Sequence, residues 1–213
     1  MKSKKDVKEI IRILKETYPE AECSLDFSNP FQMAVAVLLS AQCTDARVNI
    51  VTKELFKAGP TAEKMNKLTV KEIEKYIASC GLYKTKAKNI KGLAEMVMNT
   101  YNGEIPDTME ELMKLPGIGR KSANVVMLEA FHNPQGVAID THAKRICNRI
   151  GISKEESPEK IEQDLLKKID KDEYFDANHL CVWHGRYTCK ARKPECERCT
   201  ITKYCNYFKI KNI

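Results

Sequence analysis

The sequence lacks a hydrophobic run long enough to cross a membrane. Its longest wholly apolar stretch, Met33 to Leu39, is far shorter than the roughly 20 apolar residues that a transmembrane helix needs. The amino-terminal stretch MKSKKDVKEIIRILKE scatters charges through its apolar positions and contains no small-residue cleavage site, so it does not resemble a secretory signal. These absences indicate an intracellular protein, which we expect in the cytoplasm.

The sequence also lacks internal repeats, a low-complexity linker and sustained strand-like alternation with hairpin turns. Hydrophobic residues make up 43% of the chain and charged residues 31%, a mixture typical of globular rather than disordered proteins. Apolar residues recur with helical spacing along most of the chain, as in Val7, Ile10, Ile11 and Leu14. We therefore expect an all-α fold.

Helix start and stop signals divide the chain. Asn29-Pro30 supplies a cap and a first-turn proline, and Thr69 to Glu72 and Thr108 to Glu111 have the spacing of capping boxes. The prolines and glycines at 116–119 break one helix before another begins at Arg120. These signals predict helices over about 31–39, 44–56, 69–80, 85–101, 108–115, 120–131 and 140–150, another from 157, and a last one that reaches about 184.

The chain has nine cysteines, an odd number. Because disulfides are rare in a reducing compartment, these cysteines need an explanation other than disulfides. Four of them form the pattern C-x6-C-x2-C-x5-C, whose thiolates can converge on a zinc ion or on a cubane iron–sulfur cluster. The spacing alone leaves that choice open. The four are Cys189, Cys196, Cys199 and Cys205. The other five occur singly in apolar stretches and are interpreted as small core residues: Cys23, Cys43, Cys80, Cys147 and Cys181.

The charge balance favours a polyanionic partner. Lysine and arginine number 36 against 29 acidic residues, which gives a net charge of +7. Between the first two patterned cysteines, Lys190, Arg192 and Lys193 form a basic loop. That loop either contacts phosphates or is a solvated run of charge.

The segment from Leu115 through Pro116, Gly117 and Ile118 to Gly119 lies between two predicted helices. Its glycines permit backbone conformations that a Cβ would obstruct. A tight turn that leads into a helix also presents several unpaired N–H groups to one point, where a phosphate can bind. The segment is therefore either a phosphate-binding hairpin or a simple connection between helices.

Two residues near this hairpin and beyond it are candidates for chemistry. Lys121 stands on the first turn of an otherwise apolar helix. If its aliphatic chain packs against that surface, burial lowers the pKa of the amine and makes it a nucleophile. The alternative is that Arg120 and Lys121 are exposed phosphate contacts. Asp140 either takes part in acid–base or electrostatic catalysis or simply caps a helix. A nearby carboxylate raises a lysine pKa, whereas burial lowers it. The sequence does not show which of these two effects is larger.

Six ordered motifs resemble the endonuclease III family of DNA glycosylases, in the helix-hairpin-helix superfamily. They match collinearly over nearly the whole chain and are together far more specific than any one of them. They are LLSAQCTD at 38–45, GLYKTKAKNI at 81–90, LPGIGRKSANVV at 115–126, IDTHAKRICNR at 139–149, HGRYTC at 184–189 and the four-cysteine pattern. Ser122 and Cys43 stand where the family often has threonine and alanine, which leaves fine substrate preference open.

The resemblance implies two helical domains. A six-helix barrel with a helix-hairpin-helix motif would cover residues 22–133, and residues 1–21 with 134–213 would form a second domain that carries a [4Fe-4S] cluster on the four patterned cysteines. The active site is then expected in the cleft between the domains. The implied partner is double-stranded DNA containing damaged pyrimidines or abasic sites, and the implied protein is a monomer associated with the nucleoid.

The resemblance also implies a bifunctional DNA glycosylase and abasic-site lyase. An oxidised pyrimidine leaves the duplex stack, Lys121 attacks C1′, Asp140 assists departure of the base, and the resulting Schiff base permits β-elimination on the 3′ side. Gln42 and Leu82 match positions that fill the hole in the duplex; otherwise they are a helix-end amide and a core leucine. Further DNA contacts are expected at Leu115, Gly117, Ile118, Gly119, Lys190, Arg192 and Lys193.

Two other functions stay open. A mismatch-specific relative would remove an undamaged adenine or thymine, but adenine-specific relatives usually lack the lysine and carry an extra C-terminal domain, for which there is no room after Ile213. A non-catalytic module would use the hairpin for phosphates and the cluster as a clamp or redox sensor. Such a module predicts salt-sensitive duplex binding without preference for damage.

Overall fold

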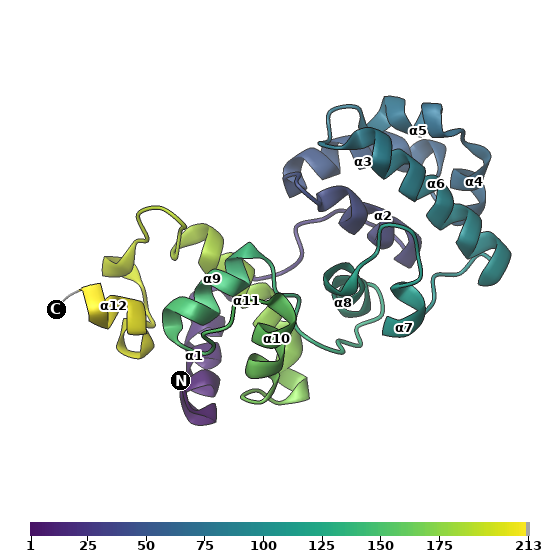
Figure 1. The fold of residues 1–213 in the computed structure, drawn as a ribbon. Coiled ribbons are helices and arrows are strands. Elements are labelled where there is room, and N and C mark those ends of the chain that lie inside the picture. Colours follow the sequence, from purple (N-terminus) through teal and green to yellow (C-terminus); the bar gives the residue numbers. More distant parts are fainter. Residues whose placement is uncertain (212–213) are drawn as a thin grey trace. The chain divides into compact units, whose positions relative to one another are not determined.

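The computed structural model describes residues 1–211, which form two compact units (Figure 1). Unit 1 comprises Met1–Cys23 and Pro134–Ile213, and unit 2 comprises Ser24–Asn133. Within the described residues the regular elements are all helical, so the all-α prediction is confirmed. None of the described helices is long and apolar enough to cross a membrane.

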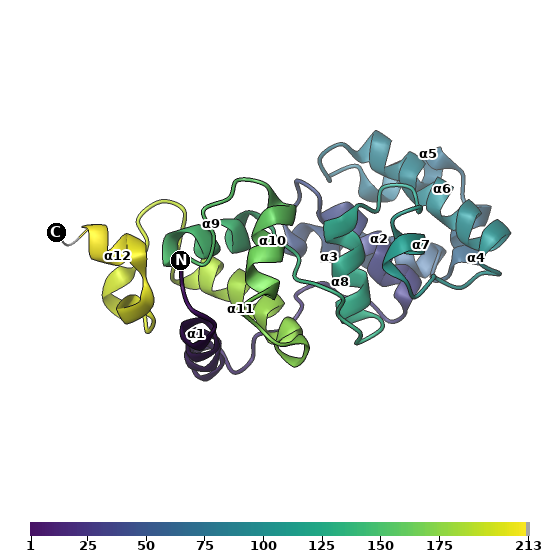
Figure 2. The ribbon, with the colours of Figure 1, turned by 60° about the horizontal axis from the view of Figure 1, so that its bottom comes forward.

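Unit 2 is built around α2, which is buried on nearly every side. Residues Phe31 to Leu39 of this helix are all buried, as expected for a continuous apolar run. α2 packs against α3, α6 and α8, while α4 and α5 pack against α6 (Figure 2). The helices of unit 2 are α2 (Pro30–Ser40), α3 (Asp45–Ala58), α4 (Ala62–Lys67), α5 (Val70–Ile77), α6 (Tyr83–Thr100), α7 (Met109–Leu112) and α8 (Arg120–Glu129). The sequence pattern did not predict α4, which is too short to show periodicity.

The predicted caps form with one exception. Asn29 Oδ1 accepts the Gln32 N–H at 2.9 Å, and Thr69 and Glu72 form a reciprocal capping box. At α7, Thr108 accepts the Glu111 N–H, but the Glu111 carboxylate instead accepts the Tyr101 hydroxyl at 2.6 Å and pairs with Lys114. The second half of this capping box is therefore replaced by a contact with the chain that follows α6.

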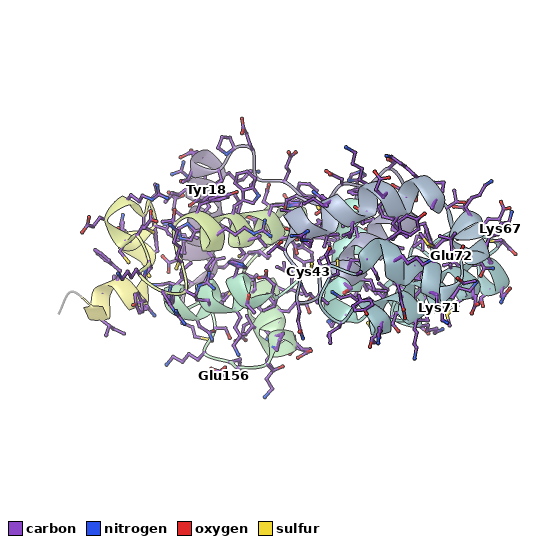
Figure 3. All side chains as sticks on the ribbon, turned by 90° about the horizontal axis from the view of Figure 1, so that it is seen from above. Tyr18, Cys43, Lys67, Lys71, Glu72 and Glu156 are labelled. Carbon is purple, nitrogen blue, oxygen red and sulfur yellow. The ribbon has the colours of Figure 1, made fainter. Side chains whose placement is uncertain are left out.

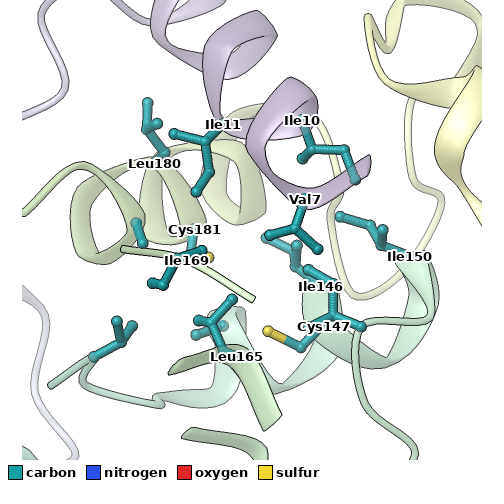
Figure 4. Packing of buried hydrophobic residues seen from close by; sticks show 14 of the residues in the cluster. Val7, Ile10, Ile11, Ile146, Cys147, Ile150, Leu165, Ile169, Leu180 and Cys181 are labelled. Carbon is teal, nitrogen blue, oxygen red and sulfur yellow. The ribbon is translucent and has the colours of Figure 1, made fainter. Parts of the chain in front are cut away.

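Unit 1 encloses a separate hydrophobic core (Figure 4). The apolar face of α1, formed by Val7, Ile10, Ile11 and Leu14, is buried in this core, and α9 and α11 pack against each other beside it. The helices of unit 1 are α1 (Lys4–Thr17), α9 (Thr141–Ile150), α10 (Pro158–Leu166), α11 (Tyr174–Tyr187) and α12 (Asn206–Lys211), with 3₁₀ turns η1 (Lys171–Glu173), η2 (Cys196–Arg198) and η3 (Thr202–Tyr204).

The prediction that the last long helix ends before Gly185 is wrong, because α11 continues to Tyr187. A Cβ at Gly185 would lie 2.7 Å from His142 Cβ and 2.8 Å from His142 Nδ1. The glycine therefore permits close approach of α9 to α11 and does not act as a helix stop. This close approach brings the end of α11 next to α9, where the patterned cysteines follow.

Candidate active site and cysteine centre

The glycine-rich hairpin joins α7 to α8 in unit 2. Gly117 has a left-handed φ of 79°, and a Cβ there would lie 2.8 Å from Leu38 Cδ1, so the turn needs glycine. Leu115 and Ile118 are buried, with 2% and 4% of their surface exposed, and the Ile118 N–H donates to Leu115 O at 3.1 Å. Their side chains anchor the hairpin, so the expected DNA contacts of these two residues are limited to backbone atoms.

Gly119 begins α8 without a side-chain cap. Its backbone is extended, with φ −96° and ψ 179°, and open space surrounds the position that a Cβ would occupy. The first N–H groups of a helix have no acceptor within the helix, and here no side chain caps them. An open, uncapped helix N-terminus with its partial positive charge suits an anion such as a phosphate.

Lys121 is the second residue of α8, and its side chain is exposed. Of the two alternatives that the sequence left open, the exposed one describes Lys121 in this structure, because burial in this helix begins only at Ala123. The preceding Arg120 is exposed as well. The Lys121 side chain is therefore accessible to a ligand at the open end of α8.

Two exposed residues with left-handed backbones lie on adjacent loops of unit 2. Gln42 follows α2 with φ 53°, and Leu82 precedes α6 with φ 58°. The loops touch, since a Cβ on Gly81 would lie 3.2 Å from Gln42 O. Leu82 is 59% exposed, which excludes its interpretation as a core leucine. Strained, exposed non-glycine residues of this kind are typical of functional loops.

The sequence reasoning missed Lys86, which holds one of these loops. Lys86 is 4% exposed, and its Nζ donates to Leu39 O at 2.9 Å and to Ala41 O at 2.6 Å. Carbonyl groups at a helix end have no partner within the helix, and the lysine provides one next to Gln42. A sequence signal existed, because Lys86 shares the helical spacing of the buried Ile90 and Leu93.

Asp140 caps α9 in unit 1. Its Oδ1 accepts the Ala143 N–H at 2.7 Å, so one of its two carboxylate oxygens caps the helix. Among the described residues, no hydrogen-bond donor reaches the other oxygen, Oδ2. The half-buried carboxylate is thus fixed in orientation by one oxygen and keeps the second for another partner.

The four patterned cysteines gather in unit 1. Cys189, Cys196, Cys199 and Cys205 line a single cavity. Burial, together with the three other thiols, raises the pKa of Cys199 to about 11. Burial likewise raises the pKa of Cys205, with Cys189 and Cys196 adding to the rise. Thiols raise one another's pKa only when they lie close together, and a bound cationic centre reverses this effect.

The donor set of this cavity suits an iron–sulfur cluster. Its four cysteines come from one short segment and line one cavity. A cubane cluster takes one cysteine thiolate on each of its four irons. The four cysteines therefore fit a [4Fe-4S] cluster.

Two side chains contact the sulfur atoms of this centre. Arg149 Nη1 donates to Cys189 Sγ at 3.4 Å and to Lys190 O at 2.8 Å. His184 Nε2 lies 3.8 Å from Cys199 Sγ, and its Nδ1 lies 3.0 Å from the hydroxyl of Tyr18. Burial, with a further effect of Arg145, lowers the pKa of His184 to about 4. The sequence alone assigned no role to Arg149 or His184, although they lie within the family motifs at 139–149 and 184–189.

The basic loop is only partly available to a ligand. Lys190 pairs with Glu195, and this contact lowers the pKa of the Glu195 carboxyl. Arg192 and Lys193 are exposed, and neither has an ion pair with a described residue. Phosphate contacts therefore remain open to Arg192 and Lys193, whereas Lys190 already has a carboxylate partner.

The five remaining cysteines do not all behave as core residues. Cys80, Cys147 and Cys181 are buried, as expected, but Cys23 and Cys43 are only half-buried. They also do not all stand alone: burial and the neighbouring Cys43 raise the pKa of Cys80, and Cys147 and burial raise the pKa of Cys181. Spacing along the chain cannot reveal such pairs, because their members come from different elements.

Two known families match the chain. The HhH-GPD superfamily base excision DNA repair protein family matches residues 35–171. The iron-sulfur binding domain of endonuclease III matches residues 189–205, from the first patterned cysteine to the last. Together the matches cover the hairpin, both candidate catalytic residues and the cysteine centre.

Curated relatives and solved structures agree with these matches. Endonuclease III of Synechocystis is 46% identical over 96% of this chain and 94% of its own length. Endonuclease III of Escherichia coli K12 is 42% identical over 93% of this chain and 94% of its own length. A trapped endonuclease III–DNA covalent intermediate superposes with a TM-score of 0.94 and 41% identity, over 100% of both chains. The match to a thermostable thymine-DNA glycosylase, with a TM-score of 0.82, 24% identity and coverage of 97% of this chain and 98% of that one, shows a shared fold.

Proposed function

Because the chain belongs to the HhH-GPD superfamily of base excision DNA repair proteins, and within it to the endonuclease III family, we propose that it excises oxidised pyrimidines from duplex DNA and cuts the strand 3′ to the abasic site. It is a DNA glycosylase that binds DNA and carries a [4Fe-4S] cluster. The observation that supports the proposed excision and lyase reactions is the exposed Lys121 on the first turn of α8, directly after the hairpin.

Lys121 acts as the nucleophile in this proposal. Its unprotonated amine attacks C1′ of a nucleotide extruded from the stack, and the base departs with assistance from Asp140. The Schiff base that results acidifies the 2′ proton, so β-elimination breaks the bond on the 3′ side. Because Lys121 is exposed in the protein alone, a bound nucleotide can reach its amine.

DNA contacts flank this reaction. Gln42 and Leu82 enter the space left by the extruded nucleotide, which suits two exposed side chains on touching loops. The hairpin amides of Gly117 and Gly119 bind a nearby phosphate. The proposed organisation assigns the six-helix barrel to unit 2 and the cluster to unit 1, in a protein that acts as a monomer.

Cys189, Cys196, Cys199 and Cys205 hold the cluster in this proposal. When bound, the cluster would cross-link the segment between α11 and α12, which otherwise contains only short 3₁₀ turns. Arg149 reinforces this segment through Cys189, Lys190 and Ala191. The chain thereby holds Arg192 and Lys193 at the surface, where phosphates can approach. An active, colourless protein that contains zinc would remove the cluster assignment.

Borohydride trapping tests the lyase proposal. The protein is incubated with duplexes that contain an oxidised pyrimidine or an abasic site, and borohydride reduces any Schiff base to a stable adduct. We expect an adduct with wild type and none with Lys121→Gln. If wild type forms no adduct with either duplex, the lyase proposal is wrong; an adduct that persists in Lys121→Gln assigns the nucleophile elsewhere.

Lys71→Gln is the matched control for this experiment. Lys71 is also an exposed lysine at the second position of a helix in unit 2 (Figure 3). The N-terminus of its helix, however, is closed by the capping box of Thr69 and Glu72. We expect Lys71→Gln to trap DNA as wild type does, which separates the loss of the nucleophile from the loss of one positive charge.

A further inference from the structure

Two thiols of unit 2 meet where the loops of Gln42 and Leu82 touch. Cys43 directly follows Gln42, and Cys80 precedes Leu82 by two positions. The backbones of the loops are in contact at Gly81, where a Cβ would lie 3.2 Å from Gln42 O. Cys43 also helps to raise the pKa of the Cys80 thiol, as only a neighbouring thiol does. A bond between these sulfurs would therefore join the two loops directly.

The two thiols differ in access to solvent. Cys43 is half-buried and within reach of a small reagent, whereas Cys80 is 2% exposed. Burial raises the pKa of Cys80 to about 11, with the neighbouring Cys43 adding to the rise, so Cys80 stays protonated and reacts slowly with external reagents. An external oxidant therefore meets Cys43 first, and Cys80 is placed to react with the product.

A second pair of thiols provides an internal reference. Cys147 likewise raises the pKa of Cys181, but the two residues lie in the core of unit 1 with 0% and 8% of their surfaces exposed (Figure 4). Both are less exposed than the half-buried Cys43. Neighbouring thiols are thus common to both pairs, and exposure distinguishes the pair in unit 2.

We propose that Cys43 and Cys80 form a reversible disulfide on reaction with a low-molecular-weight disulfide, and that this bond weakens DNA binding. The Cys43 thiolate attacks one sulfur of a molecule such as oxidised glutathione, and one glutathione thiolate leaves. The Cys80 thiol then loses its proton to the released glutathione thiolate and attacks the Cys43 sulfur, which releases the second glutathione. Two protein thiols lose two electrons, and one external disulfide is reduced to two thiols.

The effect on DNA follows from the change in loop spacing. A disulfide holds its sulfurs about 2.05 Å apart, closer than two thiols that are not bonded to each other. The new bond draws the two loops together and thereby changes the positions of Gln42 and Leu82 relative to each other. This effect on binding rests on the proposed function of those two side chains, whereas formation of the disulfide does not.

Peptide mapping tests bond formation. The holoprotein is incubated with oxidised glutathione, its free thiols are alkylated, and a protease digest is analysed by mass spectrometry. We expect a linked peptide that joins Cys43 to Cys80 and disappears with dithiothreitol, and no link between Cys147 and Cys181. In Cys80→Ala, a glutathione adduct on Cys43 should persist. A wild-type protein that shows only this adduct, or neither product, would overturn the proposal.

Binding to a duplex that contains an uncleavable abasic analogue tests the effect of the bond. We expect cross-linked wild type to bind roughly tenfold more weakly than reduced wild type, since a displacement of about 1 Å at an active site has effects of this size or larger. Dithiothreitol should restore the affinity. Cys43→Ala is the control, because Cys43 is half-buried and alanine adds no bulk; it should bind equally before and after oxidation.

The outcomes separate the two proposals. If cross-linked wild type keeps full affinity, or if Cys43→Ala loses affinity as wild type does, the bond does not control binding. Failure of the proposed function would appear differently. Reduced wild type would then show no preference for the abasic analogue over an intact duplex, while the linked peptide would be unaffected.

Discussion

Lys86 ties the carbonyl oxygen of Ala41 to α6, although the two residues are 45 positions apart in the sequence. The same ammonium group satisfies Leu39 O. A buried lysine with carbonyl acceptors fixes the end of α2 at the point where the chain turns into the loop of Gln42. The strained φ of 53° at Gln42 is thereby maintained from a neighbouring helix.

Lys86→Met should destabilise the protein and weaken DNA binding together. Methionine keeps most of the apolar stem but leaves two carbonyl groups without their partner, at a cost of about 1–3 kcal/mol in the free energy of unfolding. Urea unfolding measures this loss, and titration with an abasic-analogue duplex measures affinity. Lys88→Met, at an exposed position of the same helix, is the control. Equal stability of the two variants would show that the carbonyl contacts contribute nothing.

Gly119→Ser should change stability and DNA affinity in opposite directions. Gly119 has extended dihedrals and open space around a Cβ, so serine fits and its hydroxyl can cap the bare N-terminus of α8. Since serine caps better than glycine by a few tenths of a kcal/mol, unfolding should need slightly more urea. The hydroxyl would also occupy amides that bind a phosphate, so affinity for duplex DNA should fall. An affinity that is unchanged would argue against a phosphate at this helix end.

Gly117→Ala provides the comparison for this variant. Gly117 has a φ of 79°, and its Cβ would press against Leu38 and Asn89, so alanine should lower stability by about 1–3 kcal/mol. The two glycines of one hairpin are thus expected to respond in opposite ways to an added side chain. Urea unfolding of both variants under one condition checks the contrast.

Sequence periodicity was sufficient for most of the fold because the longer helices have local signals, whereas the six-residue helices α4 and α12 do not. The apolar run of α2, the face of α1 and the caps at Asn29 and Thr69 all depend on residues within a few positions of one another. The helix end expected before Gly185 was wrong because the requirement for this glycine lies on another helix, at His142. The exposure of Lys121 stayed undecided for a related reason, since it is set by the packing of the helix and not by its composition.

The residues that support the site were mostly beyond the reach of sequence reasoning. Arg149 contacts Cys189 across 40 positions, and Tyr18 contacts His184 across 166. Such contacts become visible only when the chain is folded, because one sequence contains no information about which distant residues meet. The four-cysteine pattern was the exception, since its members lie close together along the chain and share one chemistry.

Cys199→Ser should weaken DNA binding before it impairs lysine chemistry. Cys199 lines the cysteine cavity in unit 1, whereas Lys121 belongs to unit 2. Loss of one cluster ligand should disorganise the segment that holds Arg192 and Lys193, with a loss of affinity of roughly tenfold or more, or at least 1.4 kcal/mol. Borohydride trapping at saturating DNA should remain near the wild-type level. Cys23→Ser, in the same unit but outside the cavity, is the control, and an equal loss of trapping and affinity in Cys199→Ser would contradict this order.

The ion pairs of Asp170 should make the stability of unit 1 depend on pH. Lys4 Nζ lies 2.5 Å from Asp170 Oδ1, and Lys8 pairs with Oδ2. These lysines lower the pKa of Asp170 from 3.8 to about 2. Because folding favours the ionised carboxylate, its contribution is complete above about pH 4 and is lost as the pH falls toward 2.

Asp170→Asn should therefore unfold at lower urea concentration than wild type at pH 6, and the difference should shrink as the pH is lowered through this range. The contribution is small because the pair is exposed, and salt should reduce it. Asp172→Asn removes the same charge two positions away, at an exposed side chain that forms no ion pair with a described residue. Urea midpoints of the three proteins between pH 3 and pH 7 check the prediction. If Asp172→Asn shows the same loss and pH dependence as Asp170→Asn, net charge and not the contact with α1 controls stability here.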